Sequence, residues 1–223
     1  AHQARERWLA DISHELRTPV AVLQGELEAL VDGIRQPDPA RLASLHQEVL
    51  HLRKLLDDLH DLALADAGSL RYRFADIDLS TLLTEALAAM AGRLEDHDLT
   101  MEVTLPSAPQ WIQGDATRLR QLVDNLLDNS IKYTDRGGRL QLRLEHHNNG
   151  LRLQLSDSAP AVNRDDLARL FDRLYRVDSS RNRQLGGAGL GLALCRRIAE
   201  AHGGQIRADL SPLGGLCMTV ELP

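Results

Sequence analysis

The stretch Leu-Gln-Leu-Arg-Leu-Glu-His-His-Asn-Asn-Gly-Leu-Arg-Leu-Gln-Leu spans residues 140–155 and decides the fold class of this chain. Leucine alternates with polar residues on both sides of Asn149-Gly150, so each half has the two-residue period of a half-buried strand. Asn-Gly between two such runs is a strong signal for a tight turn. The stretch therefore predicts a β-hairpin.

Further helices and strands are expected on both sides of this hairpin. Helical spacing of apolar residues is found in 79–94, 115–133 and 190–202, with Asp115 as the expected N-cap of the second helix. Alternation typical of strands is found in 99–105, 206–210 and 218–222. Three helices and a set of antiparallel strands predict an α+β sandwich, in which one sheet carries the helices on one face.

The first third of the chain has a different pattern. Apolar residues recur every three or four positions from Trp8 to Ile34 and from Leu42 to Leu62, and Pro37 and Pro39 are expected to end the first helix. Two long helices with a short connection predict an antiparallel helical hairpin. Only 3% of residues are aromatic, so one hairpin cannot cover both leucine-rich stripes. We therefore expect two copies to pair as a four-helix bundle.

Length and composition limit the classes of function. The 223 residues suffice for two modest domains, which we expect at 1–70 and 76–223. A net charge of -6 argues against a general nucleic-acid-binding protein. Cys195 and Cys217 lie in leucine-rich surroundings and are expected to be buried free thiols. No apolar run reaches the ~18–20 residues that span a bilayer.

A histidine stands on the exposed side of the first helix, in the motif Ser-His-Glu-Leu-Arg-Thr-Pro at 13–19. His14 lies off the apolar stripe, and Thr18 follows one turn later on the same face. Pro19 cannot donate to the carbonyl of Glu15, so the helix is expected to bend or loosen there. An exposed imidazole is a competent nucleophile, Glu15 could take its proton and Thr18 could orient a water. The simpler alternative is an ordinary exposed histidine.

The second motif, Asn-Leu-Leu-Asp-Asn-Ser-Ile-Lys-Tyr, occupies 125–133. Asn125 and Asn129 are four residues apart on one helix face, with Lys132 beside them. An amide oxygen is a suitable ligand for Mg²⁺, and an ammonium group suits a phosphate. The alternative is a solvated polar face whose lysine complements the helix dipole.

The third motif, Gly-Gly-Ala-Gly-Leu-Gly-Leu, occupies 186–192 before a helix. Glycines at a helix N-terminus allow backbone N–H groups to approach an anion. The spacing matches neither a P-loop nor a dinucleotide-binding unit. The preceding residues 172–184 carry four arginines and two aspartates, which predicts a basic lid over a nucleotide. The alternative is an ordinary surface loop.

In this order the motifs resemble those of bacterial two-component sensor histidine kinases, over practically the whole chain. Residues 13–19 are similar to the family's H-box, 125–133 to its N-box and 187–192 to its G2-box. Residues 170–176 resemble the F-box, with Leu174 where phenylalanine is usual. The details most resemble the BaeS-type envelope-stress sensors.

The resemblance implies a HisKA dimerisation and phosphotransfer domain, followed by an ATP-binding domain of the Bergerat (GHKL) fold. His14 would attack the γ-phosphoryl group of ATP and pass it to an aspartate on a cognate response regulator, while Glu15 and Thr18 would also support its removal. Asn129 would ligate Mg²⁺, and Asp157 would accept from the adenine amino group. The other implied ATP contacts are Asn125, Lys132, Tyr133, Arg176, Gly187, Gly189, Leu190 and Gly191.

The resemblance also bears on why no membrane-spanning segment is found in this sequence. It implies that the chain is the cytoplasmic portion of a bacterial inner-membrane sensor, whose membrane segments lie outside this sequence. It further implies a homodimer, and the net charge of -6 argues against nucleic acid as a partner.

One departure from the family's pattern concerns the ATP pocket. The usual Asp-x-Gly-x-Gly is here Asp157-Ser-Ala159-Pro-Ala161. If either alanine site needs a positive φ, alanine costs about 1 kcal/mol or more, and two methyl groups could narrow the pocket. Low ATP affinity is therefore expected, and a dimeric scaffold or phosphatase with an impaired ATP site is the main alternative. Another Bergerat-type ATPase, such as a chaperone or topoisomerase subunit, has no use for the upstream His14.

Overall fold

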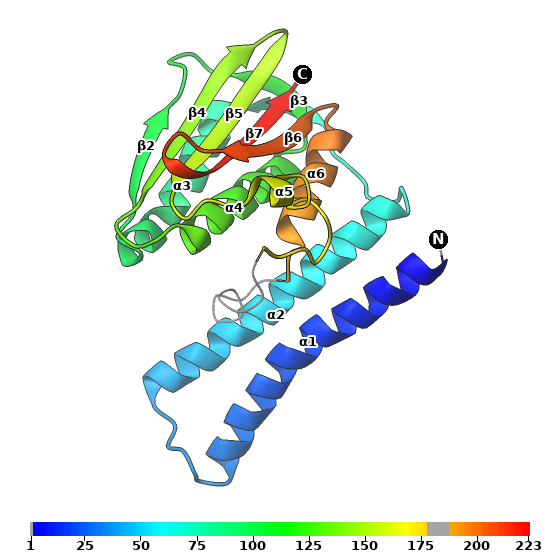
Figure 1. Cartoon of the computed structure of the whole chain (residues 1–223), viewed down its shortest axis with the longest axis vertical. Coiled ribbons are helices and arrows are strands. Elements are labelled where there is room, and N and C mark those ends of the chain that lie inside the picture. The colour runs from blue at the N-terminus through cyan, green and yellow to red at the C-terminus, as the bar shows by residue number, and fades with distance from the viewer. Residues whose placement is uncertain (1, 178–187) are drawn as a thin grey trace. The chain divides into compact units, whose positions relative to one another are not determined.

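The computed structural model describes residues 2–177 and 188–223 and shows two compact units, Ala1–Ala63 and Leu64–Pro223 (Figure 1). No helix in these ranges combines the length and the apolar character that crossing a membrane requires. Cys195 and Cys217 are buried free thiols, as expected.

The first unit is a hairpin of two long helices. Helix α1 spans His2–Val31, and α2 spans Pro39–Asp66 and runs on into the second unit. The expectation that Pro37 and Pro39 end the first helix is wrong, because α1 already ends at Val31 and Pro39 is the first residue of α2. A proline is well suited to that position, where the N–H has no helical partner. The side chain of Asp38 accepts from the N–H of Arg41 at 2.8 Å and so caps α2.

Helix α1 continues through Pro19, which is buried. Of the expected apolar stripe, Ile12 is buried and Leu16 is half-buried, but Val20 is 46% exposed in the single chain. The stripe is therefore only partly covered by the partner helix within one hairpin.

The second unit is built on a five-stranded sheet in the order β2-β4-β5-β7-β6. The strands span Thr100–Thr104 (β2), Arg139–His147 (β4), Gly150–Ser158 (β5), Gln205–Leu210 (β6) and Gly214–Leu222 (β7). The alternation in 140–155 fixes the register, since Leu142 pairs with Leu155 and Leu144 with Leu153. All four of these leucines are buried, so one face of the sheet is apolar.

Three helices cover this apolar face (Figure 1). They are α3 (Leu79–Asp96), α4 (Ala116–Tyr133) and α6 (Gly191–Ala201); a fourth, α5, is the short turn Arg164–Leu167. Asp115 is the N-cap of α4, as predicted, and its side chain accepts from the N–H of Arg118. The helices and sheet thus form the predicted α+β sandwich.

Three details differ from the prediction. Strand β2 is parallel to β4, because the chain crosses over through α4 between them. Two short strands, β1 (Ala75–Asp78) and β3 (Trp111–Gly114), form a separate antiparallel pair that the sequence pattern did not indicate. The β4–β5 turn consists of Asn148 and Asn149, with Asn148 at a φ of 52°, while Gly150 already belongs to β5.

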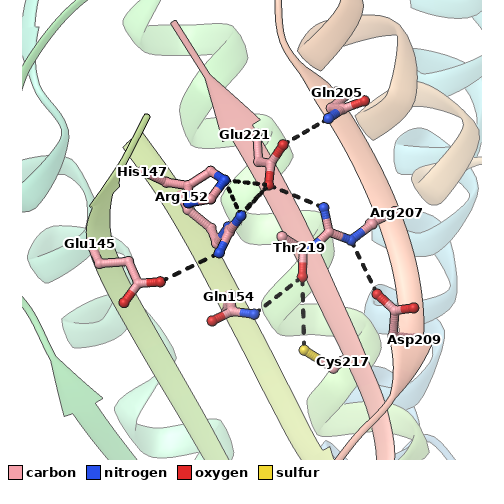
Figure 2. A network of polar contacts seen from close by, with 10 residues as sticks. All are labelled: Glu145, His147, Arg152, Gln154, Gln205, Arg207, Asp209, Cys217, Thr219 and Glu221. Carbon is pink, nitrogen blue, oxygen red and sulfur yellow. Dashed lines mark hydrogen bonds and ion pairs between the residues drawn. The ribbon is translucent and has the colours of Figure 1, made fainter. Parts of the chain in front are cut away.

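Polar side chains cover the opposite face of the sheet (Figure 2). Glu221 on β7 is their centre: it accepts from Arg152 of β5 at 3.0 Å and from Gln205 and Arg207 of β6 at 2.7 and 3.1 Å. These three donors lower the pKa of Glu221 to about 2.

Candidate functional site

The start of α6 lies against the middle of α4. Gly191 is the first residue of α6, and a Cβ there would lie 3.5 Å from the side-chain amide carbon of Asn125. Asn125 is only 7% exposed, and its amide nitrogen has no hydrogen-bond partner among the residues that the structure describes. A buried amide without a partner beside a helix N-terminus is a fit for a phosphate-bearing ligand.

The C-terminal turn of α4 adds a cation and a phenol. The ammonium group of Lys132 lies 5.0 Å from the ring centroid of Tyr133. Burial raises the pKa of Tyr133, and the positive charge of Arg176 opposes that rise. The structure thus brings Lys132, Tyr133 and Arg176 together at one end of α4, with the phenol in its neutral form.

Asp157 on β5 is the buried carboxylate of the site. Following Leu153 and Leu155 at two-residue steps, it faces the helices. Its Oδ1 accepts from the N–H of Leu216 at 2.6 Å, and its Oδ2 accepts from the hydroxyl of Ser130 at 3.2 Å. Burial raises the pKa of Asp157 to about 6, and these two hydrogen bonds oppose the rise.

A β-bulge makes the contact with Leu216 possible. Ser156 pairs with Cys217, but Ser158 pairs with Gly214, so β7 contains an extra residue at this level. The carboxylate approaches the β7 backbone closely, because a Cβ on Gly215 would lie 2.2 Å from Oδ1 of Asp157. Only glycine leaves room for the carboxylate there.

The glycine motif is anchored on the residues that resemble the F-box. Gly189 has a φ of 66°, and a Cβ on it would lie 2.7 Å from the carbonyl oxygen of Tyr175. The N–H of Leu174 donates to the carbonyl of Gly189 at 3.0 Å, and Leu174 itself has a φ of 60°. Leu190 is 4% exposed and belongs to the apolar core.

Two further predictions concern the backbone of the pocket. Ala159 and Ala161 do not have a positive φ, so the backbone penalty expected for them is absent. Gly187 lies outside the described residues. Asn129 is half-buried on α4, one turn after Asn125. Asn125, Asn129, Lys132 and Arg176 are amide and cationic residues of the kinds that could hold Mg²⁺ and a nucleoside triphosphate.

The remaining predicted site residues lie on α1, in the first unit. His14 and Thr18 are exposed and Glu15 is half-buried. The hydroxyl of Thr18 donates to the backbone carbonyl of His14 at 3.4 Å, rather than to the imidazole ring. His14 and Thr18 lie with Arg17, Ala21 and Val22 on a shallow, open part of the α1 surface.

Sequence reasoning did not identify Ser130, Gly215 and Leu216 as members of the site. One signal was available for Ser130, because it is a polar residue in the row of apolar core positions on α4. Nothing local marked Gly215 or Leu216, since their role depends on pairing with a strand about sixty residues earlier.

A helical hairpin with an exposed histidine, followed by an α+β sandwich with an asparagine-bearing helix and a glycine-rich turn, defines the core of a histidine kinase. Residues 4–68 match the family described as "His Kinase A (phospho-acceptor) domain". Residues 114–223 match the family described as "Histidine kinase-, DNA gyrase B-, and HSP90-like ATPase". The chain belongs to the sensor histidine kinase family.

Among individual proteins, the chain is 51% identical over 221 residues to the signal transduction histidine-protein kinase BaeS of Escherichia coli (strain K12). This match covers 99% of the chain and 47% of BaeS, so the chain spans about half the length of that relative. The Acinetobacter baumannii histidine kinase AdeS has a TM-score of 0.78 at 30% identity, over 94% of this chain and 96% of AdeS. Full-length ShkA in complex with AMPPNP has a TM-score of 0.67 at 26% identity, over 97% of this chain and 45% of ShkA.

Proposed function

We propose that this chain is the catalytic core of an ATP-dependent protein-histidine autokinase that serves a response regulator. The observation that carries the proposal is the placement of His14, whose side chain is exposed on an open part of the α1 surface. It lies within the residues that match the phospho-acceptor family. An imidazole in such a position is accessible both to a nucleotide and to a second protein.

The reaction is an in-line displacement at phosphorus. A ring nitrogen of His14 gives its lone pair to the γ-phosphorus of ATP, and the bond from that phosphorus to the β,γ-bridging oxygen breaks, so that ADP leaves. Glu15 accepts the proton that the phosphorylated imidazolium loses. The phosphoryl group then passes from His14 to an aspartate carboxylate of the response regulator, and the imidazole regains a proton.

The ATP-binding residues have separate roles in this proposal. Asn129 holds Mg²⁺ with support from Asn125, and the ion would neutralise phosphate charge when bound. Lys132 and Arg176 face the phosphates, and Tyr133 packs near the base or sugar. The other contacts are Asp157 with the adenine amino group and the backbone of Gly187, Gly189, Leu190 and Gly191 with the phosphates. The nucleotide analogue bound to the related ShkA supports ATP use in this fold.

We assign residues 1–70 to dimerisation and phosphotransfer and residues 76–223 to ATP binding. The whole protein is proposed to be a homodimeric bacterial inner-membrane sensor, of which this chain is the cytoplasmic portion. The match covers 47% of BaeS, so about half of that relative lies outside the part that resembles this chain. A phosphatase activity toward the regulator is proposed as well, with Glu15 and Thr18 supporting the attack of a water.

Incubation of the chain with γ-labelled ATP and Mg²⁺ tests the kinase proposal. Acid-labile label is expected on the wild-type chain and none on His14→Gln. His46→Gln, which changes an exposed histidine on α2, serves as the matched control and is expected to retain the label. Tight nucleotide binding without any transferred label would contradict the proposal.

The asparagine helix requires a separate test. Asn129→Ala is expected to abolish binding of Mg²⁺-ATP, measured by equilibrium dialysis, because it removes the amide ligand. The oligomeric state by light scattering is expected to stay unchanged, because Asn129 lies in the second unit and the proposed dimer forms through the first. Unchanged nucleotide affinity would count against the metal assignment.

A dimeric scaffold or phosphatase with an impaired ATP site is the second candidate, and Ala159 and Ala161 motivate it. The absence of a positive φ at both alanines removes one of its two physical reasons. Failure of the wild-type chain to bind ATP, combined with dephosphorylation of a phosphorylated regulator, would favour this candidate.

A further inference from the structure

Ser130 places a hydroxyl group in the interior of the second unit. It lies on α4 and is 1% exposed, between apolar core residues of the same helix. A buried hydroxyl is unfavourable unless it is hydrogen-bonded, and Ser130 satisfies this requirement by donating to Oδ2 of Asp157 at 3.2 Å. The hydroxyl is thus directed at Asp157, the buried carboxylate of the candidate nucleotide site.

The carboxylate of Asp157 is held by two donors from two different elements. The N–H of Leu216 on β7 binds Oδ1, and the hydroxyl of Ser130 on α4 binds Oδ2. One donor on each oxygen fixes the rotation of the carboxylate plane. Each carboxylate oxygen has a further lone pair, so the group can still accept from a ligand.

From this geometry we propose that Ser130 is a positioning residue for base recognition: its hydroxyl holds the carboxylate of Asp157 in the orientation that accepts from a purine amino group. This role rests on the proposed function, in which Asp157 reads the base. Ser130 itself needs no contact with the nucleotide. The residue therefore affects the preference for an amino-bearing purine more than the affinity for the phosphates.

The ionisation of Asp157 supports this role. Burial raises the pKa of Asp157 to about 6, and the hydrogen bonds from Leu216 and Ser130 oppose the rise. No charged side chain of the described residues contributes to the shift. Removal of the Ser130 hydroxyl therefore raises the pKa of Asp157 further. More of the carboxyl is then protonated near neutral pH, and a protonated carboxyl is a poorer acceptor.

The test is Ser130→Ala in the whole 223-residue chain, with ATP and purine riboside triphosphate, which lacks the amino group, as probes. At pH 7 we expect ATP binding to weaken about tenfold, the range typical of a lost hydrogen bond to a charged group. Binding of purine riboside triphosphate is expected to stay unchanged. The pH midpoint of ATP binding and the carboxyl titration of Asp157 in the nucleotide-free chain, followed by NMR, are expected to move upward.

Two matched variants separate positioning from a general structural effect. Ser130→Thr keeps the hydroxyl and is expected to restore the ATP preference. Thr134→Val removes a buried hydroxyl at the end of α4 that has no hydrogen-bond partner among the described residues, and it is expected to leave the preference unchanged. Equal weakening of both probes in Ser130→Ala, or a preference and titration identical to wild type, would overturn the proposal.

The same measurements distinguish this proposal from the proposed function. A wild-type chain that binds no ATP would contradict the proposed function. The titration of Asp157 in the nucleotide-free chain would then still decide the positioning role: an upward shift in Ser130→Ala would support it, and an unshifted titration would overturn it.

Discussion

At the scale of single residues, Gly215 leaves the space on β7 that the carboxylate of Asp157 occupies. A Cβ there would lie 2.2 Å from Oδ1 of Asp157, 2.4 Å from the carbonyl oxygen of Ser158 and 2.8 Å from that of Asp157. Gly215→Ala must therefore displace β5 from β7 or turn the carboxylate away from Leu216. We expect a loss of stability of about 1–3 kcal/mol by thermal unfolding and at least tenfold weaker ATP binding by dialysis.

Gly92→Ala is the control for this substitution. Gly92 lies within α3, and no atom would come within 4 Å of the added Cβ. Alanine is the better helix former, so this variant is expected to gain about 0.5–1 kcal/mol and to bind ATP normally. If Gly215→Ala has the stability and the ATP affinity of the wild-type chain, the prediction is wrong, and β5 and β7 accommodate the added Cβ at no measurable cost.

The residue scale also shows what sequence alone could and could not predict. The resemblance identified Asp157 as a base contact, because it occupies a motif position. Ser130 remained unrecognised because its hydrogen bond to Asp157 depends on how α4 packs on β5, and Leu216 because its hydrogen bond depends on the bulge between β5 and β7. A local pattern contains no information on that register shift.

At the scale of elements, His202 joins residues near the beginning of the second unit to the start of α4. The residue is 5% exposed, with Nδ1 2.7 Å from the carbonyl of Ile198 and Nε2 2.9 Å from the N–H of Asp115. Since that N–H can only donate, Nε2 accepts and Nδ1 carries the proton. Tyr72 and Phe74 pack on the ring at centroid distances of 5.7 and 5.0 Å.

Loss of this ring is expected to destabilise the second unit. His202→Ala removes both hydrogen bonds and the surface on which two aromatic rings pack, and leaves the buried N–H of Asp115 without its acceptor. We expect a decrease of about 2–4 kcal/mol in the free energy of unfolding, measured with urea. His146→Ala, at an exposed position of β4, is the control with no expected change. Equal stability of the two variants would refute the role of His202.

The outer face of the sheet supplies a prediction about acid. The hydrogen bonds from Gln205, Arg152 and Arg207 lower the pKa of Glu221 to about 2 from 4.5. The ionised group therefore adds stability that is present above about pH 4.5 and is lost as the pH falls toward 2. Glu221→Gln is expected to lower the thermal midpoint at pH 7 and to lose this difference below about pH 2. Parallel midpoint curves for both proteins over that range would contradict it.

The elements that sequence could predict are those with a long apolar repeat. In β4, β5 and α4 the apolar residues repeat often enough to show whether the segment is a strand or a helix. These elements were therefore predicted to within a few residues. Strand β1 has only one buried residue, Ile77, and four residues are too few to show a period. The parallel pairing of β2 with β4 depends on the direction in which the chain re-enters the sheet after α4. Strand propensity contains no information on that direction.

At the scale of the whole molecule, the first unit leaves an apolar surface without a partner in the single chain. On α2, Leu42, Val49 and Leu56 recur every seven residues and are 52%, 49% and 48% exposed. On α1, Val20 and Leu27 are also seven residues apart and are 46% and 51% exposed. A seven-residue apolar repeat is the pattern by which helices pack on other helices, so a second hairpin is the expected cover.

We therefore expect the chain to be a dimer in solution, with a mass by light scattering of about twice 24.7 kDa. Val49→Glu places a charge in the centre of the α2 repeat and is expected to shift the mass to that of the monomer, because an unpaired buried charge is strongly unfavourable. Gln47→Glu adds the same charge two residues away, on the opposite side of α2, and is expected to stay dimeric. Since each hairpin would then lose its cover, Val49→Glu should also lower the thermal midpoint of the first unit. A monomeric wild-type chain at micromolar concentration, or a dimer that Val49→Glu leaves intact, would show that the exposed repeat serves another purpose.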